Sequence, residues 1–241
     1  MYVEANNARF WVEEAGEGEP VVFLHFGLGG RRIFEPELRA LADEFRCVAF
    51  DRRFVGRTEA PAEPYSEVED VLGLLDALGI EQAALVGLSG GGKLALDVAF
   101  AHPARVRALV HIAAPVTGVP WAEDLEEVYA GAETPEQRLA VDFEVWAPLG
   151  ADDLIRELRA EVHDEPEEAV SAANPPVDLE AVPVPTLVIV AKRDPASLQS
   201  SGREAARRIP GARLVEVDSD HYLTLREPEL ISRLLREFLA A

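Results

Sequence analysis

The sequence is poor in cysteine: Cys47 is the single one among 241 residues. A disulfide within the chain is therefore excluded, and so is a zinc site built from cysteine ligands. Cys47 lies in the apolar stretch CVAF, which predicts a small buried hydrophobic side chain rather than a reactive thiol. We expect neither a metal nor a cofactor.

Positive charge is also scarce, because 23 lysines and arginines stand against 44 aspartates and glutamates, for a formal net charge of −21. Such a surface repels nucleic acids and anionic membranes, so we expect neither as a partner. No apolar run reaches the length of about 18 residues that a membrane-spanning helix requires. The first residues, MYVEANNARF, lack the basic and apolar regions of a secretory signal. We therefore expect a cytoplasmic protein that acts on a small molecule, and a homodimer stays open.

What the chain does have is an alternation of short apolar runs with helical patterns. The runs predict buried parallel strands over residues 21–25, 47–51, 83–87, 106–113, 186–191 and 212–217. The helical patterns predict helices near residues 34–45, 66–79, 90–101, 198–208 and 227–240. This order predicts an α/β fold in which a mostly parallel sheet is flanked by helices on both faces.

The alternation is interrupted in the middle of the chain by an acidic segment with helical patterns. We predict a core formed by residues 1–114 and 178–241 and a helical cap insertion over residues 115–177. Ligands of open α/β sheets bind at the carboxyl edge of the strands. We therefore expect the cap to lie over that edge.

A serine lies between glycines where one predicted strand ends and a helix begins, in the segment GLSGG at residues 87–91. The spacing G-x-S-x-G on a strand–turn–helix predicts a strained turn that exposes the hydroxyl of Ser89. Unpaired N–H groups at the start of the helix favour negative charge there. A phosphate-binding loop is the alternative, but Leu94 after Lys93 does not fit its GK[ST] ending, and the spacing G-x-G-x-x-G is not met. We therefore interpret Ser89 as a nucleophile.

A serine nucleophile needs a base, and His221 is the best candidate among the five histidines. It lies between the last predicted strand and the last helix, at the same edge of the sheet as the serine. Asp194 follows the preceding strand and is our candidate to orient the imidazole. Asp218 and Asp220 are sequence neighbours of the histidine and therefore second choices. The other histidines are expected to have structural, capping or solvated roles: His25, His102, His111 and His163.

Together these segments resemble the α/β-hydrolase superfamily over essentially the whole chain outside the cap. The chain reads HFGLGG, DRRFVGRT, GLSGG, RDP and DHYLTLREPE. Members typically read H-G-x-G, D-x-R-G-x-G-x-S, G-x-S-x-G, G-x-x-D and G-H-x-x-x-x-E-x-P-E at these places. The resemblance implies this fold and agrees with a Ser–Asp–His triad of Ser89, Asp194 and His221. It also implies an oxyanion hole formed by the backbone N–H groups of Gly27 and Gly90.

Three departures from these motifs matter. Phe26 and Phe54 each replace a glycine, and Asp220 replaces the glycine before the histidine. We expect the two phenylalanines to pack against each other and to narrow or reshape the pocket. The alternative is that each points away, with no functional effect. Asp220 places a negative charge beside the imidazole of His221, which favours its charged form.

The resemblance favours a serine esterase or enol-lactone hydrolase that cleaves small to medium carboxylic esters or lactones through an acyl-enzyme. The predicted pocket is lined by residues of the motif loops and by aromatic residues of the cap, which alternatively form the cap's own core: Phe26, Phe54, Leu88, Trp121, Tyr129, Phe143, Trp146 and Tyr222.

Three alternatives stay open. A C–C bond hydrolase would use the same triad. A proline-type aminopeptidase would in addition need a site for the substrate amine, for which the cap offers Glu123, Glu126, Glu127 and Glu144. A non-catalytic ligand-binding protein of the same fold belongs to another class, and the two phenylalanines at glycine positions favour it.

Overall fold

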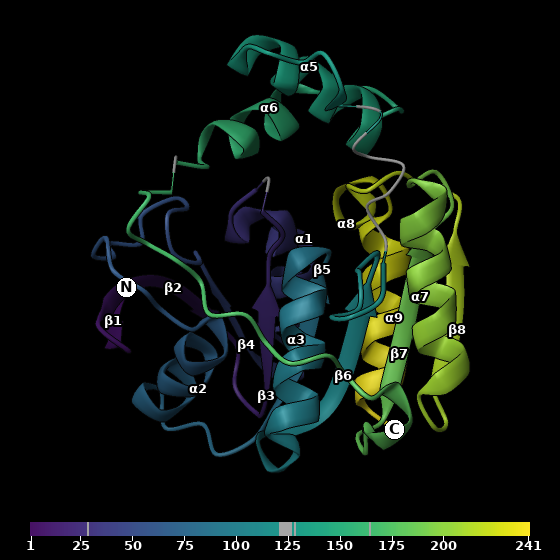
Figure 1. Ribbon diagram of the computed structural model, residues 1–241. Helices are drawn as coiled ribbons and strands as arrows, with labels where there is room; N and C mark the ends of the chain where they lie inside the picture. The colour runs from purple at the N-terminus through teal and green to yellow at the C-terminus, as the bar shows by residue number, and fades with distance from the viewer. Residues whose placement is uncertain (28, 121–126, 128, 164) are drawn as a thin grey trace.

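The chain is built around a mostly parallel sheet (Figure 1). The computed structural model describes residues 1–27, 29–120, 127, 129–163 and 165–241, and within them the sheet has eight strands in the order β1-β2-β4-β3-β5-β6-β7-β8. The strands are β1 (Tyr2–Ala5), β2 (Ala8–Ala15), β3 (Glu19–Leu24), β4 (Phe45–Phe50), β5 (Ala83–Leu88), β6 (Val106–Ile112), β7 (Thr186–Ala191) and β8 (Arg213–Val217). Pairing is antiparallel from β1 to β2 and from β2 to β4, and parallel everywhere else. The predicted α/β fold is confirmed.

Helices cover both faces of this sheet, so the inner parallel strands from β3 to β7 are mostly buried on two sides, whereas the edge strand β8 is largely exposed. The long helices of the core are α1 (Glu35–Leu41), α2 (Glu67–Ala77), α3 (Gly90–Ala101), α7 (Ala196–Arg208) and α9 (Pro228–Leu239), with the single turn α8 (Leu223–Arg226) before the last. Side chains of one strand alternate between the two faces: Val21 and Phe23 pack in the layer that contains α1 and α9, whereas Val22 and Leu24 pack in the layer that contains α2 and α3. This two-faced burial explains why the strands read as continuous apolar runs.

The first two strands are the part of the sheet that the apolar runs did not predict. They form a hairpin whose turn residues Asn6 and Asn7 have φ 42° and 63°. Asparagine tolerates these left-handed angles, which two-residue hairpin turns require. Because β1 lies at the edge of the sheet and is largely exposed, its sequence carries no apolar run.

The segment predicted as a cap, residues 115–177, contains the helices α5 (Pro135–Trp146) and α6 (Asp153–Ala160), which lie across one edge of the sheet (Figure 1). Both ends of this segment are fastened to α3. The buried carboxylate of Asp97 accepts hydrogen bonds from Thr117 Oγ1 at 2.7 Å and from Asn174 Nδ2 at 2.8 Å. We use the name cap for residues 115–177 from here on, and the division into core and cap stays a prediction.

Two absences concern only the described part of the chain. None of its helices is both long and apolar enough to cross a membrane. Nor does it contain a group of three or more His, Cys, Asp or Glu side chains that could hold a metal ion.

Candidate active site

Ser89 occupies the sharp turn between β5 and α3. Its backbone angles are φ 53° and ψ −120°, a conformation that costs free energy for a residue with a side chain. Close packing enforces the turn, since a Cβ on Gly91 would lie 2.0 Å from the carbonyl oxygen of Leu24 and one on Gly87 would lie 2.2 Å from that of Gly91. The Ser89 side chain makes no capping bond to α3, although serine is a preferred capping residue. The turn therefore strains the backbone and leaves the hydroxyl without its usual local partner.

His221 and Asp194 come together from the loops after β8 and β7. The Nδ1 atom of His221 lies 2.9 Å from Oδ2 of Asp194, and both side chains are buried. The other carboxylate oxygen of Asp194 is buried and has no hydrogen-bond partner among the residues that the structure describes. An ionised carboxylate in this position fixes the proton on Nδ1 and leaves Nε2 of the imidazole as an acceptor.

The two aspartates that were second choices are used elsewhere. Asp218 forms an exposed ion pair with Arg193, with 3.1 Å between the nearest atoms. Asp220 is fully buried, and its Oδ1 atom accepts a hydrogen bond from the backbone N–H of Tyr222 at 3.1 Å. The Asp220 carboxylate is thus hydrogen-bonded to the backbone of its own loop rather than to Asp194 or the imidazole of His221.

Aromatic rings surround the His221 imidazole. The ring of Phe26 lies edge-on to it with 5.3 Å between centroids, and the ring of Trp146 lies tilted over it at 4.6 Å. The backbone N–H of His221 also donates to the carbonyl oxygen of Trp146 at 3.2 Å. No hydrogen bond between Ser89 Oγ and His221 is present among those of the described residues. Catalytic hydrogen bonds in ligand-free sites are often long and tighten when substrate binds.

Of the two amides predicted for an oxyanion hole, that of Gly27 lies on the loop after β3 and that of Gly90 lies in the first residue of α3. The backbone nitrogen of Gly27 lies 4.0 Å from the position that a Cβ on Gly90 would occupy. His25 holds this loop through both ring nitrogens, because Nδ1 donates to the carbonyl of Phe26 at 2.8 Å and Nε2 accepts from the backbone N–H of Arg52 at 2.8 Å. Burial, with the nearby Arg52 cation, lowers the pKa of His25 to about 4, so the imidazole is neutral at pH 7 and suited to this double role.

The expected contact between Phe26 and Phe54 is wrong. Phe26 packs against His221 and, with 5.4 Å between centroids, against Tyr222, whereas the ring of Phe54 meets Tyr65 at 5.9 Å. In the part of the chain that the structure describes, the two phenylalanine rings form no contact with each other. Phe54 lies farther along the loop after β4, with its backbone at φ 60°, an angle that glycine adopts without strain and that agrees with the glycine of the motif D-x-R-G-x-G-x-S at this place.

The remaining pocket candidates differ in position. Leu88 has no exposed surface and packs in the core below the serine turn. Tyr129 and Phe143 are partly buried in the cap, and Tyr129 accepts a hydrogen bond from Trp146 Nε1 at 3.1 Å. Trp121 lies outside the described residues. The pocket as a whole stays a prediction.

Three other histidines were expected to have structural, capping or solvated roles. His111 is fully buried in β6, where burial lowers its pKa to about 4. His102 ends α3, and His163 is exposed, with Nε2 3.1 Å from the carbonyl oxygen of Gly56.

Sequence analysis missed one residue near the site, Arg226, which contacts Asp220 and the cap. Its guanidinium Nη2 lies 3.4 Å from Oδ2 of Asp220. The sequence offers one indication of this contact: Asp220 and Arg226 carry opposite charges on one loop, and both depart from the motif G-H-x-x-x-x-E-x-P-E. Charges six residues apart in a loop do not by themselves predict a contact.

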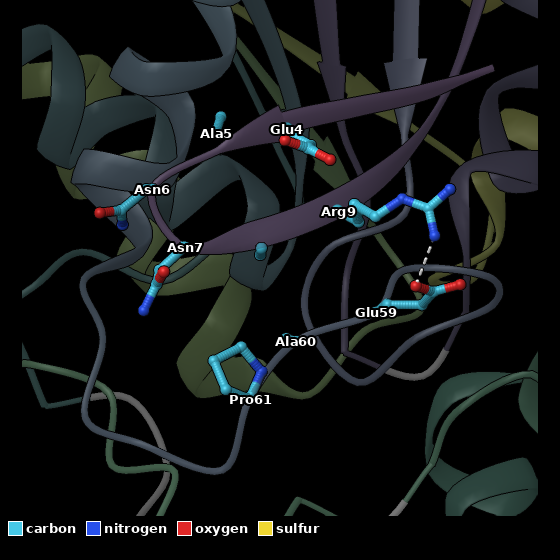
Figure 2. A pocket seen from close by; sticks show the side chains of 9 residues that line it. Glu4, Ala5, Asn6, Asn7, Arg9, Glu59, Ala60 and Pro61 are labelled. Carbon is cyan, nitrogen blue, oxygen red and sulfur yellow. Dashed lines mark hydrogen bonds and ion pairs between the residues drawn. The ribbon is translucent and has the colours of Figure 1, made fainter.

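A broad surface groove lies elsewhere on the molecule, between the β1–β2 hairpin and residues 59–61 (Figure 2). It has a volume of about 610 Å³, and its charged residues Arg9 and Glu59 pair with each other at 2.8 Å. Its lining includes none of Ser89, Asp194 and His221, so we do not assign the candidate active site to it.

Comparison with known proteins defines the class. The model of the alpha/beta hydrolase family matches residues 21–234, and the chain belongs to this family.

The names of the similar proteins state several different activities. A 2-hydroxymuconate semialdehyde hydrolase of Pseudomonas putida is 31% identical, over 95% of this chain and 90% of its own length. The crystal structure of the enol-lactonase from Burkholderia xenovorans LB400 is 25% identical, with a TM-score of 0.83 and complete coverage of both chains. The structure of Est816, an N-acyl homoserine lactone degrading enzyme, is 26% identical, with a TM-score of 0.71 over 99% of this chain and 100% of that one.

Proposed function

We propose that this protein is a serine hydrolase that cleaves small to medium carboxylic esters or lactones through an acyl-enzyme intermediate. The observation that carries the proposal is the conformation of Ser89. Its backbone is held at φ 53° on the turn into α3, and its hydroxyl makes no capping hydrogen bond to that helix. Strain of this kind persists only where the surrounding structure enforces it, and it clusters at functional sites. The buried pair of His221 and Asp194 supplies the base that a serine hydroxyl needs.

In the proposed mechanism, Ser89 Oγ attacks the acyl carbon while Nε2 of His221 takes the hydroxyl proton. Asp194 stabilises the imidazolium through the bond to Nδ1. The amides of Gly27 and Gly90 bind the oxyanion that forms, and the imidazolium returns the proton to the leaving alcohol. Water then attacks the acyl-enzyme with His221 as base, which releases the acid and restores Ser89.

Two similar structures support a lactone or ester. The enol-lactonase and the lactone-degrading Est816 both share the fold over nearly the whole chain. The rings of Phe26 and Trp146 beside His221 give the site apolar walls. A neutral or weakly polar acyl group fits such walls better than a polyanion does.

A second candidate is hydrolysis of a C–C bond by the same residues. It is favoured by the 31% identity to the 2-hydroxymuconate semialdehyde hydrolase over 95% of this chain. The aminopeptidase alternative has less support, since Glu127 and Glu144 are exposed to solvent, and Glu123 and Glu126 lie outside the described residues.

The test is a substrate panel with Ser89→Ala as the matched control. The panel contains p-nitrophenyl esters of increasing chain length, aliphatic and enol lactones, and coloured ring-cleavage dienones for the C–C reaction. We expect turnover of short esters or lactones, and a loss of at least about 10³-fold in kcat for Ser89→Ala. Equal hydrolysis by both proteins would refute the serine mechanism.

Labelling by a fluorophosphonate probe separates the non-catalytic alternative. We expect the parent protein to be labelled at Ser89 and the Ser89→Ala variant to stay unlabelled. Turnover of dienones at a higher kcat/KM than any ester or lactone would select the C–C hydrolase instead. A folded parent protein that neither labels nor turns over any substrate of the panel would favour a ligand-binding protein.

A further inference from the structure

Asp220, the residue before His221, has no exposed surface and connects two parts of the molecule. Its Oδ1 atom accepts from the backbone N–H of Tyr222 at 3.1 Å, on the loop that carries His221. Its Oδ2 atom accepts from the backbone N–H of Leu149 at 3.3 Å, in the cap turn that follows α5. One buried carboxylate therefore joins the histidine loop to the cap.

Arg226, at the end of α8, completes this connection. Its Nη2 atom lies 3.4 Å from Oδ2 of Asp220 and also donates to the carbonyl oxygen of Gly150 in the cap. Its Nη1 atom lies 3.7 Å from Oδ2 of Asp152, at the start of α6. A buried carboxylate without a cation beside it would be costly, so Asp220 and Arg226 stabilise each other as a unit.

The cap turn fastened in this way, residues 147–150, directly follows Trp146, the last residue of α5. Trp146 contacts His221 twice: its carbonyl oxygen accepts from the backbone N–H at 3.2 Å, and its ring lies 4.6 Å from the imidazole. The far side of the Trp146 ring is anchored as well, because Nε1 donates to the hydroxyl of Tyr129 at 3.1 Å. A shift of the turn at residues 147–150 would therefore move a ring that packs on the base.

Both members of the pair depart from the motif that the rest of the loop follows. The motif G-H-x-x-x-x-E-x-P-E has glycine where this chain has Asp220 and glutamate where it has Arg226. Glycine offers no acceptor to the cap, and a glutamate at 226 would repel a carboxylate at 220. The two departures are thus physically matched to each other.

We propose that Asp220 and Arg226 are positioning residues that lock the cap turn at residues 147–150 to the loop of His221, and so hold the imidazole in its reactive orientation. The proposal rests on the proposed function, in which His221 is the base. The pair acts through His221 and Trp146 and does not touch the substrate. A misplacement of about 1 Å in a catalytic group can cost up to about 100-fold in rate, so loss of the pair should be visible in kcat.

The experiment compares Asp220→Asn, Asp220→Gly, Arg226→Met and the double variant Asp220→Asn/Arg226→Met. Asp218→Asn is the matched control, because it removes an equal charge from the same loop at an exposed position that pairs only with Arg193 among the described residues. Steady-state kinetics on the best ester or lactone give kcat and KM separately. Trp146 fluorescence is measured in a Trp11→Phe/Trp121→Phe background, which leaves one of the three tryptophans.

We expect each single variant to lose about tenfold in kcat, with a smaller change in KM, while Asp218→Asn stays within twofold of the parent. The double variant should be no worse than the poorer single variant, because the two residues act as a unit. Trp146 emission should shift to the red and become more accessible to acrylamide.

The result that overturns the proposal is a set of folded Asp220 and Arg226 variants that keep kcat within twofold. A lower unfolding midpoint with unchanged kcat overturns it too, since the pair would then be only structural. Ser89→Ala separates this failure from that of the proposed function. If that variant stays active, the serine mechanism fails, whereas Trp146 fluorescence still reports whether the pair fastens the cap.

Discussion

Glu37 offers a sharp test of the packing around α1. Its side chain has no exposed surface, and neither carboxylate oxygen has a hydrogen-bond partner in the part of the chain that the structure describes. Burial raises the pKa of this carboxyl well above its ordinary value. Glu37 is therefore protonated in the folded protein at pH values where the unfolded chain has already lost the proton.

The sign of the effect follows from this difference. The folded state binds one proton more than the unfolded state between the two pKa values, so the free energy of unfolding falls as the pH rises above the unfolded pKa. The loss is at most about 1.4 kcal/mol for each pH unit, or about 3 kcal/mol from pH 5 to pH 7. Glu37→Gln keeps the shape and removes the proton. It should match the parent near pH 4.5 and become more stable than the parent as the pH rises.

The measurement is urea denaturation of the parent and of Glu37→Gln at pH 5, 6, 7 and 8. Glu35→Gln is the control, because it lies on the same helix but forms an ion pair with Arg39 near the surface. Only the Glu37 difference should grow with pH. Glu37→Leu should in addition gain about 1–3 kcal/mol at every pH, because no buried polar group is left unpaired. Parallel curves for the parent and Glu37→Gln would refute the reasoning.

Three further predictions concern the site and its loops. Asp194→Asn should keep the fold but lower kcat by about 10³- to 10⁴-fold on the best substrate, because the amide no longer fixes the proton on the imidazole; a loss under tenfold would contradict this. Phe54→Gly should have a free energy of unfolding about 1 kcal/mol higher in urea than Phe54→Ala, because both variants lose the ring contact with Tyr65 but only glycine adopts φ 60° without strain. The opposite order of stability would show that this backbone angle is not costly. Gly91→Ala should yield little folded protein on circular dichroism, because its Cβ would lie 2.0 Å from the carbonyl oxygen of Leu24; an unchanged melting temperature would mean that the turn relaxes.

The sequence was informative where local patterns and burial agree. The inner strands β3 to β7 are mostly buried and read as apolar runs. All six predicted strands are present, the more exposed edge strand β8 included, with boundaries within about two residues. The turn at Ser89 was equally readable, since Gly87 and Gly91 lie where a side chain cannot fit. The edge strand β1 was missed because an exposed edge needs no apolar run.

Long-range contacts were less predictable. Phe54 was expected to meet Phe26 because the two lie on neighbouring loops, yet the actual partner is Tyr65, which the loop after β4 reaches only by folding back. The rings around His221 come from Phe26 and Trp146, which lie 195 and 75 residues before it in the chain. No spacing rule connects such positions, because the contact between these rings depends on how the cap packs on the sheet.

The way the cap is held also bears on specificity. On one side of the serine strand, the loop after β4 bonds to the cap, where the N–H of Gly56 donates to the carbonyl oxygen of Glu161 at 2.8 Å. On the other side, Asp220 accepts from Leu149 at 3.3 Å. β4 and β8 lie on opposite sides of β5 in the sheet, so the cap is fastened across the strand that carries Ser89. In the proposed mechanism, a substrate that reaches the Ser89 hydroxyl would fit beneath the cap, and the same cap would position His221 as the base. On this proposal, we expect cap substitutions to change kcat as well as KM, and we expect an exchange of the cap to transfer substrate preference only when the loop of His221 is exchanged with it.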